Sequence, residues 1–423
     1  MGVRKGNKLT EVGEIPEDWI SASLKELASK KNNAIVGGPF GSDLTAKDYT
    51  TVGIPVIRGQ NMARKYVSGD SVFVSEGKAK DLYANTATNN DLVFTQRGTL
   101  GQVSIVPPGG KKTYLISQSQ MKITLDEEKA NSCYVYYYFL STYGQKQITS
   151  SAIQTGVPHT NLGILKQYLV PLPVSIIEQS AIADALGDAD DLIDSLEGLI
   201  EKKRLIKRGA MEELLTGKRR LPGFAEPWHS YSLNEVSVKI QDGTHFSPKS
   251  GGRDFLYITS RNIKQGRLDI SSAEYISTEE HEKIYSRCDT NTNDLLLTKD
   301  GANTGNAAIN ILTEPFSLLS SVAAIRCDST KADPFFLLQI ILSSIGKKAI
   351  ADLLSGNAIT RLTLVKIRHL TFLFPLVEEQ SAIAQVLSDM DAEIEALEAK
   401  LEKARAIKRG MMEELLSGRI RLV

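Results

Sequence analysis

Side chains suited to contacts with nucleic acid recur at matching places in the two halves of this 423-residue chain. Arginine presents paired donors that match guanine, amide side chains match adenine, and lysine, serine and threonine more often hold phosphates. In the first half the candidate residues are Ser42, Lys47, Tyr49, Arg58, Gln60, Asn61, Gln96, Arg97 and Thr99. In the second half they are Thr244, His245, Lys249, Arg261, Asn262, Lys299 and Asn303. Their recurrence predicts two surfaces that contact DNA.

Glycine-containing loops carry the first candidates of each half. The segment GGPFGS at 37–42 leads to Lys47, and DGTH at 242–245 leads to Lys249. A single turn of this kind near a basic residue is most often only a turn. The repetition of the clusters in both halves therefore supports the DNA-contact interpretation more strongly than any one loop does.

The motifs of several catalytic sites are absent from the sequence. An adenine methyltransferase needs Asn/Asp-Pro-Pro-Tyr/Phe, whereas DPF at 333–335 lacks the second proline. A Walker A loop is absent because Ile105 stands where its first glycine belongs. Asp70, Glu76 and Lys78 echo a metal-dependent nuclease, but their spacing is short and the second half has no counterpart. We therefore predict no catalytic residue in this chain.

Composition narrows the possible classes further. The cysteines Cys133, Cys288 and Cys327 are odd in number and far apart, so neither a disulfide framework nor a metal site is expected. The 50 basic residues balance the 50 acidic ones, whereas a nucleic-acid-binding surface is usually basic. No apolar run approaches the roughly 20 residues of a membrane span, and the N-terminus lacks the apolar core of a signal peptide. We expect no membrane contact and a cytoplasmic location.

The chain also contains an internal repeat, which places these residues in an architecture. EQSAIADALGDADDLIDSLEGLIEKKRLIKRGAMEELLTG at 178–217 matches EQSAIAQVLSDMDAEIEALEAKLEKARAIKRGMMEELLSG at 379–418, with 25 of the 40 positions identical. Fainter matches join PEDW at 16–19 to AEPW at 225–228, IPVIRGQNM at 54–62 to FLYITSRNI at 255–263, and NDLVFTQRG at 90–98 to NDLLLTKDG at 293–301. The chain thus repeats a unit of about 200 residues, in which the helical part stayed alike while the globular part diverged.

The repeated segments predict long amphipathic helices at about 178–216 and 379–417. Apolar residues recur at heptad spacing along each helix and predict a coiled-coil seam. The seam residues are Ile182, Leu186, Ile193, Leu196 and Ile200, then Ile383, Leu387, Met390, Ile394, Leu397 and Leu401. Pro173 and Pro375 prevent earlier starts, and Gly217 and Gly418 suit the C-terminal ends.

Charge predicts how the two helices pair. Acidic residues crowd the first part of each helix, and basic residues crowd the part that follows, as in Asp190 before Lys207 and Asp391 before Lys408. A parallel pair would set acid against acid, whereas an antiparallel pair sets acid against base. We therefore predict an antiparallel two-helix coiled coil with a pseudo-twofold axis and a globular module at each end.

The remaining segments predict two mixed, mostly β modules of the α+β class. Short apolar runs separated by turn residues indicate strands, and helices close the modules near 132–149 and 334–354. The predicted order is a first module at 1–155, a first repeated region at 156–217, a second module at 218–355 and a second repeated region at 356–423. VGEIPEDW at 12–19 continues the pattern that breaks off at RIRLV, so the arrangement is circular and the termini should lie close together.

The module–helix–module–helix order, the PEDW start, the EQSAIA and IKRGxMEELLxG segments and the DGTH loop resemble the specificity subunit of type I restriction–modification enzymes. The resemblance covers essentially the whole chain and is very specific in the repeated helices. It implies that each module is a target recognition domain, which reads one half of a bipartite DNA site. It also implies that the coiled coil sets the spacing between the halves and docks two modification subunits.

The resemblance places the chemistry on partner subunits. S-adenosylmethionine is expected on the modification subunits, and ATP and Mg are expected with the restriction subunits that cleave DNA. This chain would supply the address on double-stranded DNA. Two other classes remain open from the residues alone: a self-contained nuclease or methyltransferase, and a coiled-coil adaptor that binds only proteins.

Overall fold

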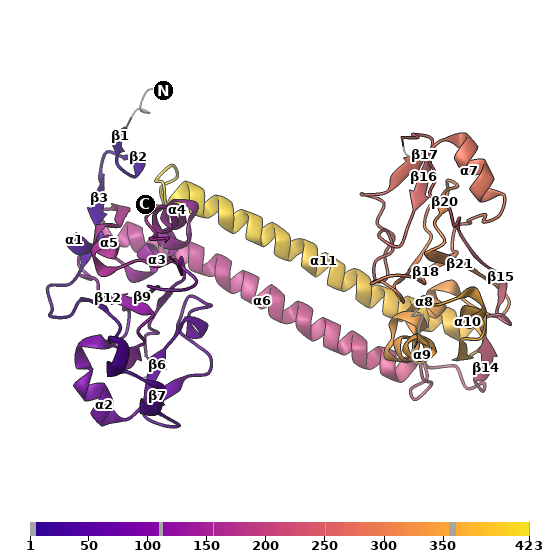
Figure 1. The fold of residues 1–423 in the computed structure, drawn as a ribbon, viewed down its shortest axis with the longest axis horizontal. Helices are drawn as coiled ribbons and strands as arrows, with labels where there is room; N and C mark the ends of the chain where they lie inside the picture. The colour runs from indigo at the N-terminus through magenta and orange to yellow at the C-terminus, as the bar shows by residue number, and fades with distance from the viewer. Residues whose placement is uncertain (1–5, 110–112, 155, 250, 355–360, 423) are drawn as a thin grey trace. The chain divides into compact units, whose positions relative to one another are not determined.

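The computed structural model describes residues 6–109, 113–154, 156–249, 251–354 and 361–422. The chain divides into two compact units, and each unit is described here by itself. Unit 1 comprises residues 1–196 and 400–423, and unit 2 comprises residues 197–399. Each unit therefore combines one module with the beginning of one long helix and the end of the other (Figure 1).

Unit 1 contains the first module. Its strands are β1 (Asn7–Thr10), β2 (Gly13–Pro16), β3 (Trp19–Ser23), β4 (Ile35–Gly37), β5 (Tyr49–Thr50), β6 (Ile54–Ile57), β7 (Val72–Val74), β8 (Thr86–Ala87), β9 (Leu92–Thr95), β10 (Val103–Ile105), β11 (Tyr114–Ile116), β12 (Gln120–Ile123) and β13 (Leu169–Pro173). Its short helices are α1 (Leu24–Leu27), α2 (Glu76–Asp81), α3 (Ser132–Leu140), α4 (Thr142–Ser150) and α5 (Leu162–Gln167).

Unit 2 contains the second module. Its strands are β14 (His229–Ser232), β15 (Ser237–Asp242), β16 (Phe255–Ile258), β17 (Glu274–Ile276), β18 (Leu295–Thr298), β19 (Ala307–Ile309), β20 (Ser317–Leu318), β21 (Val322–Cys327) and β22 (Thr371–Phe374). Its short helices are α7 (Thr278–Tyr285), α8 (Pro334–Leu342), α9 (Ser344–Leu354) and α10 (Leu364–Arg368).

The two modules share one topology. The sheet β10-β9-β12-β4 of the first corresponds to β19-β18-β21-β15 of the second, and β7-β6-β11 corresponds to β17-β16-β20. The correspondence includes the only parallel pairings between named strands of the described residues, β6 with β11 and β16 with β20. The central strands β9 and β18 read LVFT and LLLT and are buried throughout. The predicted class, two repeated α+β modules rich in β structure, is confirmed.

Each module has a core beside the long helices and a smaller core away from them. In unit 1 the buried Trp19 lies edge-to-face against Tyr134, with ring centroids 6.4 Å apart. In unit 2 Trp228 contacts Phe336 in the same manner at 6.1 Å. The smaller cores include Ile57 and Met62 in the first module, and a matching set around Ile258 in the second. The PEDW and AEPW segments therefore matched because their tryptophans occupy equivalent core positions.

The helices that close the modules are interrupted, where the sequence suggested one continuous segment in each. Ser141 separates α3 from α4, and Ser343 separates α8 from α9. Each serine has an extended backbone, and its hydroxyl accepts a hydrogen bond from the amide of the glycine three residues later. A local helix N-cap thus competed successfully with continuation of the helix.

The long helices are α6 (Ile176–Leu214) and α11 (Val377–Leu415). Both begin two residues before the predicted start and end two residues before the predicted end, and each has 39 residues. Gly217 and Gly418 lie just beyond them with φ of 69° in both cases, a left-handed conformation that favours glycine. Among the described residues, no helix is both long and apolar enough to cross a membrane.

Within each unit the two helices run antiparallel, as the charge pattern predicted. In unit 1, Lys408 of α11 forms an ion pair with Asp190 of α6, while Leu415 and Leu416 share a core with Ile182 and Leu186. In unit 2, Lys207 bonds to Asp391 at 2.5 Å, and Lys203 and Arg204 bond to Glu393 and Glu398. Acid meets base along both contacts.

The predicted seam is buried at most positions. Ile182, Leu186, Leu196, Ile200, Ile383, Leu387, Ile394 and Leu401 are buried, and Ile193, Met390 and Leu397 are half-buried. The first positions of each seam have a further role, because Ile182 and Leu186 lie in the core of the first module and Ile383 and Leu387 in that of the second. The seam therefore attaches each module to a helix as well as pairing the helices.

The glutamine of each EQSAIA segment fixes the start of a long helix to its module. The Gln179 side chain accepts a hydrogen bond from the Asn131 amide at 2.8 Å and donates to the Pro173 carbonyl at 2.8 Å. Gln380 accepts from the Asp333 amide at 2.9 Å and donates to the Pro375 carbonyl at 2.8 Å. Because both glutamines are fully buried, their identity is constrained by this attachment.

The glutamate beside each glutamine belongs to an Arg–Glu–Trp cluster. In unit 1 the cluster is Arg421, Glu178 and Trp19, with Arg421 Nη2 2.7 Å from Glu178 Oε2 and its guanidinium 5.8 Å from the tryptophan ring centroid.

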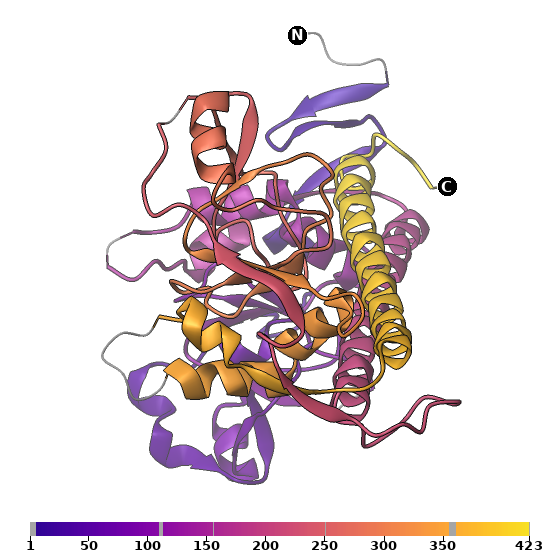
Figure 2. The ribbon, with the colours of Figure 1, turned by 90° about the vertical axis from the view of Figure 1, so that its right-hand side faces the viewer.

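In unit 2 the cluster is Arg220, Glu379 and Trp228, with the corresponding distances 2.6 Å and 5.8 Å. Arg421 also donates to Asp18 and holds the pKa of that carboxyl below its usual value. Both views draw the end of α11 beside β2 and β3 (Figures 1 and 2). Together with the Arg421 contacts in unit 1, this confirms the predicted circular continuation.

Candidate DNA-contact site

A pocket of about 440 Å³ lies at one edge of the first module, and we call it the first pocket. Its lining consists of Gly59, Gln60, Thr95, Arg97, Thr99, Gln102, Ser119 and Gln120. Three loops contribute: the turn after β6, the loop after β9 and the turn before β12. The structure thus brings together three candidate residues from separate segments of the sequence, Gln60 on one side and Arg97 and Thr99 on the other.

A second pocket, of about 470 Å³, lies at the equivalent edge of the second module. Arg261 follows β16 as Gln60 follows β6, and Asp300 follows β18 as Arg97 follows β9. Ser321 likewise precedes β21. The second pocket extends further over its module, because Lys249, Glu274 and Tyr275 also line it. Two diverged modules therefore retain a polar pocket at the same place.

The predicted residues differ in how much of their side chains reaches solvent. Exposed residues are Ser42, Lys47, Gln60, Arg97, Thr99, His245, Lys249, Arg261 and Asn303. Half-buried residues are Tyr49, Arg58 and Gln96. Buried residues are Asn61, Thr244, Asn262 and Lys299. Ser42, Lys47 and Tyr49 do not line the first pocket, and neither His245 nor Asn303 lines the second.

The two buried asparagines hold the turns that follow β6 and β16. Asn61 accepts from the Arg58 amide at 3.1 Å and donates to the Asp70 carbonyl at 3.0 Å. Asn262 accepts from the Thr259 amide at 3.0 Å and donates to the Asp269 carbonyl at 3.0 Å. Both amide groups are engaged within the module, so these residues hold the turns that carry Gln60 and Arg261, and their side chains offer no exposed edge to DNA.

Lys299 and Thr244 are likewise engaged inside the second module. Lys299 is 3% exposed and pairs with Asp242 at 2.7 Å. Thr244 bonds through its backbone to Leu318 and through its hydroxyl to the Phe246 amide. A Cβ at Gly243 would lie 1.8 Å from the Leu318 carbonyl oxygen, and one at Gly38 would lie 1.9 Å from that of Ser117. The glycine loops therefore recur because the backbone passes too close for a side chain.

Tyr257 contributes a buried hydroxyl to the lining of the second pocket. It is 5% exposed, its hydroxyl has no hydrogen-bond partner among the described residues, and burial raises its pKa to about 12. An unpaired buried hydroxyl is unfavourable and tends to be retained where a ligand or water completes it. By strand pairing the equivalent residue of the first module is Val56. The two pockets thus have the same location and different chemistry.

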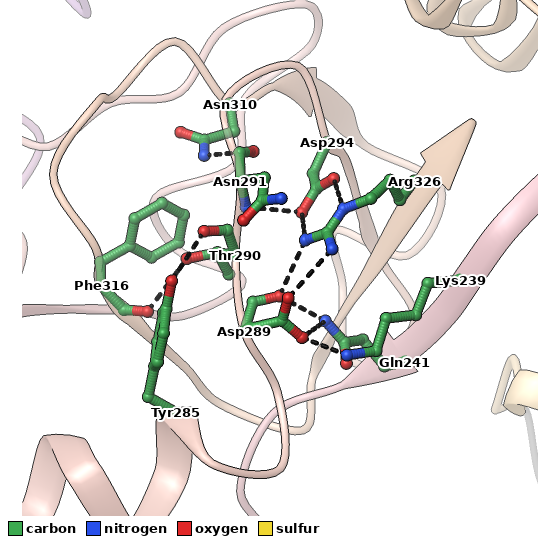
Figure 3. Close-up of polar contacts among 10 residues, drawn as sticks. All are labelled: Lys239, Gln241, Tyr285, Asp289, Thr290, Asn291, Asp294, Asn310, Phe316 and Arg326. Atoms are coloured by element: carbon green, nitrogen blue, oxygen red, sulfur yellow. Dashed lines mark hydrogen bonds and ion pairs between the residues drawn. The ribbon is translucent and has the colours of Figure 1, made fainter. Parts of the chain in front are cut away.

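A charged cluster in the second module joins β15 and β21 to the segment between α7 and β18 (Figure 3). Arg326 of β21 bonds to both Asp289 and Asp294 at 2.9 Å, and Asp289 also pairs with Lys239 of β15. The Lys239 hydrogen bond and then the Arg326 contacts hold the pKa of Asp289 well below its usual value. The cluster fixes the segment between α7 and β18, which precedes the strand that leads to Asp300.

Arg361 was missed by the sequence prediction. Its side chain forms an ion pair with Asp300, with Nε 2.8 Å from Oδ2, at the margin of the second pocket. By sequence alone, TRLTL at 360–364 matches TNLGI at 160–164, and this match sets Arg361 against Asn161. The helix caps show a shift of two residues, because Asn161 caps α5 and Thr363 caps α10. The position equivalent to Arg361 is therefore His159.

Comparisons with known proteins define the family. The model of the type I restriction modification DNA specificity domain matches residues 16–203 and again residues 225–405. The putative type I restriction enzyme MjaX specificity subunit of Methanocaldococcus jannaschii is 26% identical over 441 residues, covering 98% of this chain and 96% of that protein. The MjaVIII specificity subunit of the same organism is 26% identical, covering 96% and 94%.

Solved structures share the fold. The S subunit of a type I restriction–modification system from M. genitalium has a TM-score of 0.61 at 16% identity, covering 96% of this chain and 97% of that one. A chain from a structure that addresses complex assembly and conformational transition of the type I R-M system has a TM-score of 0.57 at 14% identity, covering 96% and 99%.

Because the two domain matches span most of the sequence, the chain belongs to the type I restriction–modification DNA specificity family. Members of this family recognise DNA sequence as non-catalytic subunits of multisubunit restriction–modification complexes. The predicted family and the assignment of a non-catalytic recognition role are confirmed. The predicted domain boundaries stay predictions, and at two of them residues 155, 355 and 356 lie outside the described residues.

Proposed function

We propose that each module reads one half of a bipartite site on double-stranded DNA, with the first and second pockets as the centres of the two reading surfaces. The observation that carries the proposal is the recurrence of a polar pocket at the same place in two diverged modules. Arginine and amide side chains reach solvent there, and these are the side chains that pair with base edges.

The paired long helices, in this proposal, set the distance between the two half-sites and hold two modification subunits. Their buried seam and ion pairs make them stiff, and 39 residues at about 1.5 Å each give a helix of roughly 58 Å. The modification subunits supply S-adenosylmethionine and methyl transfer, and restriction subunits supply ATP- and Mg-dependent cleavage. Neutral net charge suits this division, because the partners then contribute much of the phosphate contact.

The direct test is a genome-wide map of methyladenine in cells that co-express the chain with its modification subunit. We expect one motif with two defined halves and an unread gap of constant length. A motif that is continuous, or methylation that is independent of this chain, would contradict the proposal. Binding of the purified complex to cognate and scrambled duplexes distinguishes it from a protein-only adaptor, for which the two affinities would be equal.

A second test addresses the role of the helices as a spacer. Seven residues inserted after Leu196 and seven after Leu401 keep the heptad pattern on both helices. One heptad adds about 10 Å, which corresponds to about three base pairs at 3.4 Å each. We expect the unread gap to lengthen by about three base pairs while both halves keep their sequence. An unchanged gap would rule out the spacer role.

A further inference from the structure

The loops after β9 and β18 place one pair of residues at equivalent positions. NDLVFTQRG and NDLLLTKDG align Arg97 with Asp300, and each is followed by a glycine with positive φ, 103° at Gly98 and 86° at Gly301. Both residues line the pocket of their module. An exposed cation in one module thus stands where the other has a carboxylate.

A second chain segment runs beside this position in both modules. In the first, Arg97 and His159 form an isolated antiparallel bridge, and the Thr160 amide bonds to the Gln96 carbonyl at 2.9 Å. In the second, the Leu362 amide bonds to the Lys299 carbonyl at 3.1 Å. The same backbone contact therefore sets Arg361 opposite Asp300 as His159 lies opposite Arg97.

The two modules carry the arginine on different segments of this backbone contact. The first module has Arg97 beside His159, and the second has Asp300 beside Arg361. No hydrogen bond or ion pair of the Arg97 guanidinium is found among the described residues. The ion pair with Asp300 engages Nε of Arg361, and within the same residues neither terminal nitrogen has such a partner. Each module thus offers the two parallel donors of one guanidinium at this contact. In the first module the arginine lies on the loop after β9, and in the second it lies on the segment opposite the loop after β18.

We propose that Arg97 and Arg361 are equivalent specificity-determining residues, each reading a guanine in the half-site of its own module, and that Asp300 is a positioning residue for Arg361. Guanine is the base whose major-groove edge carries the two acceptors that a guanidinium matches. The inference rests on the proposed function, since it assigns bases within half-sites whose existence that proposal predicts. His159 is too short and has too few parallel donors to replace either arginine in this role.

The test is the methyladenine map of cells carrying the chain with its modification subunit, repeated for single variants. In Arg97→Ala, one position of the first half that required guanine should accept other bases. In Arg361→Ala, one such position of the second half should do so. A bidentate arginine discriminates between bases by about ten- to a hundredfold, so methylation of mismatched sites should rise by that factor. Arg64→Ala and Arg267→Ala are matched controls on exposed arginines outside the pockets, and they should leave both halves unchanged.

A transplant sharpens the test. Arg97→Asp alone should lose the guanine, and Arg97→Asp combined with His159→Arg should restore it by recreating the Asp300–Arg361 arrangement in the first module. Arg97→Lys keeps the charge and loses the paired donors, so degeneracy in that variant cannot come from misfolding. Asp300→Asn should weaken guanine preference in the second half less than Arg361→Ala does.

The outcomes separate this inference from the proposed function. If the unaltered complex shows no bipartite motif, the proposed function fails. If the motif is bipartite and both halves keep every guanine in Arg97→Ala, Arg97→Lys and Arg361→Ala, the assignment of the two arginines is wrong while the proposed function stands. Failure of the transplant to restore the guanine would overturn the equivalence of the two positions.

Discussion

The two units of this chain differ most where their pockets lie and least where the modules meet the long helices. The Arg–Glu–Trp clusters and the buried glutamines recur in both units, with the same Arg–Glu ion pair and with glutamine-to-proline hydrogen bonds of 2.8 Å in each. At the second pocket, by contrast, Arg261 occupies the position equivalent to Gln60 of the first module, and Tyr257 occupies the position equivalent to Val56. Attachment to the helices constrains the first set of residues, and the pocket residues are not under that constraint.

The units also differ in what covers the end of a long helix. In unit 1 a groove of about 180 Å³ beside Leu416 is walled on one side by the β1–β2 hairpin, including Val12 and Ile15. In unit 2 the equivalent groove beside Leu215 is lined only by the module and the helix end, among the residues that the structure describes. The two units therefore match in their attachment residues and differ in what lines this groove, where unit 1 adds the β1–β2 hairpin.

The largest expected effect is on the glycines of the GGPFGS and DGTH loops, Gly38 and Gly243. Gly243→Ala places a Cβ 1.8 Å from a backbone oxygen, and Gly38→Ala does the same at 1.9 Å. Each should lower the free energy of unfolding of its own unit by more than about 3 kcal/mol, since neither backbone can yield easily. Urea unfolding followed by tryptophan fluorescence separates the units, because Trp19 reports unit 1 and Trp228 reports unit 2 once the other is replaced by phenylalanine.

Gly198→Ala is the control for these variants. It lies exposed within α6 with nothing within 4 Å of the added Cβ, so it should stabilise the helix by about 1 kcal/mol. Equal destabilisation of both units by Gly243→Ala would contradict the division of the chain into two separate compact units.

The next largest effect is on the Arg–Glu–Trp clusters. Arg220→Ala leaves Glu379, which is 1% exposed, as a buried carboxylate without its cation, and Arg421→Ala does the same to Glu178. Because each arginine is partly exposed, we expect a loss of about 2–3 kcal/mol in the free energy of unfolding of the affected unit. The same fluorescence measurement checks both. A loss below about 0.5 kcal/mol would show that the clusters contribute little to attachment.

An acid-dependent difference should distinguish the units. The folded-state pKa of Asp289 is depressed by Lys239 and Arg326, so its contribution is present above the unfolded pKa near 3.9 and is lost as pH falls below it. Asp289→Asn should cost unit 2 about 1 kcal/mol at neutral pH, and the difference from the unaltered protein should shrink between about pH 4 and pH 2. Unfolding of the Trp228 reporter at a series of pH values measures it. A difference that is constant with pH would contradict the assigned cause.

The smallest effect is on an exposed helix pair. Arg204 and Glu398 have side chains about half exposed, so Arg204→Ala should change the free energy of unfolding by less than about 0.5 kcal/mol. Lys207→Ala should cost more, because that lysine is 15% exposed and bonds to Asp391 through both oxygens. The same denaturation series measures both variants. A larger loss for Lys207→Ala supports burial as the source of stability, whereas equal losses would support simple charge pairing.

The helical architecture could be predicted from sequence, whereas the pocket composition could not. Heptad spacing, flanking prolines and segregated charges gave the extent and pairing of α6 and α11, because these signals act within one element or between two long ones. The burial of Asn61, Asn262 and Lys299 depends on which backbone atoms surround them. Arg361 was missed for the same reason, since only the folded loop brings it to Asp300.

The most direct test of the two-module account is a methyladenine map of cells in which residues 1–155 are replaced by the module of another family member. The account predicts that one half of the methylated motif changes while the other half and the gap between them stay the same. A change in both halves, or in neither, would contradict the conclusion that each module reads its own half of the site.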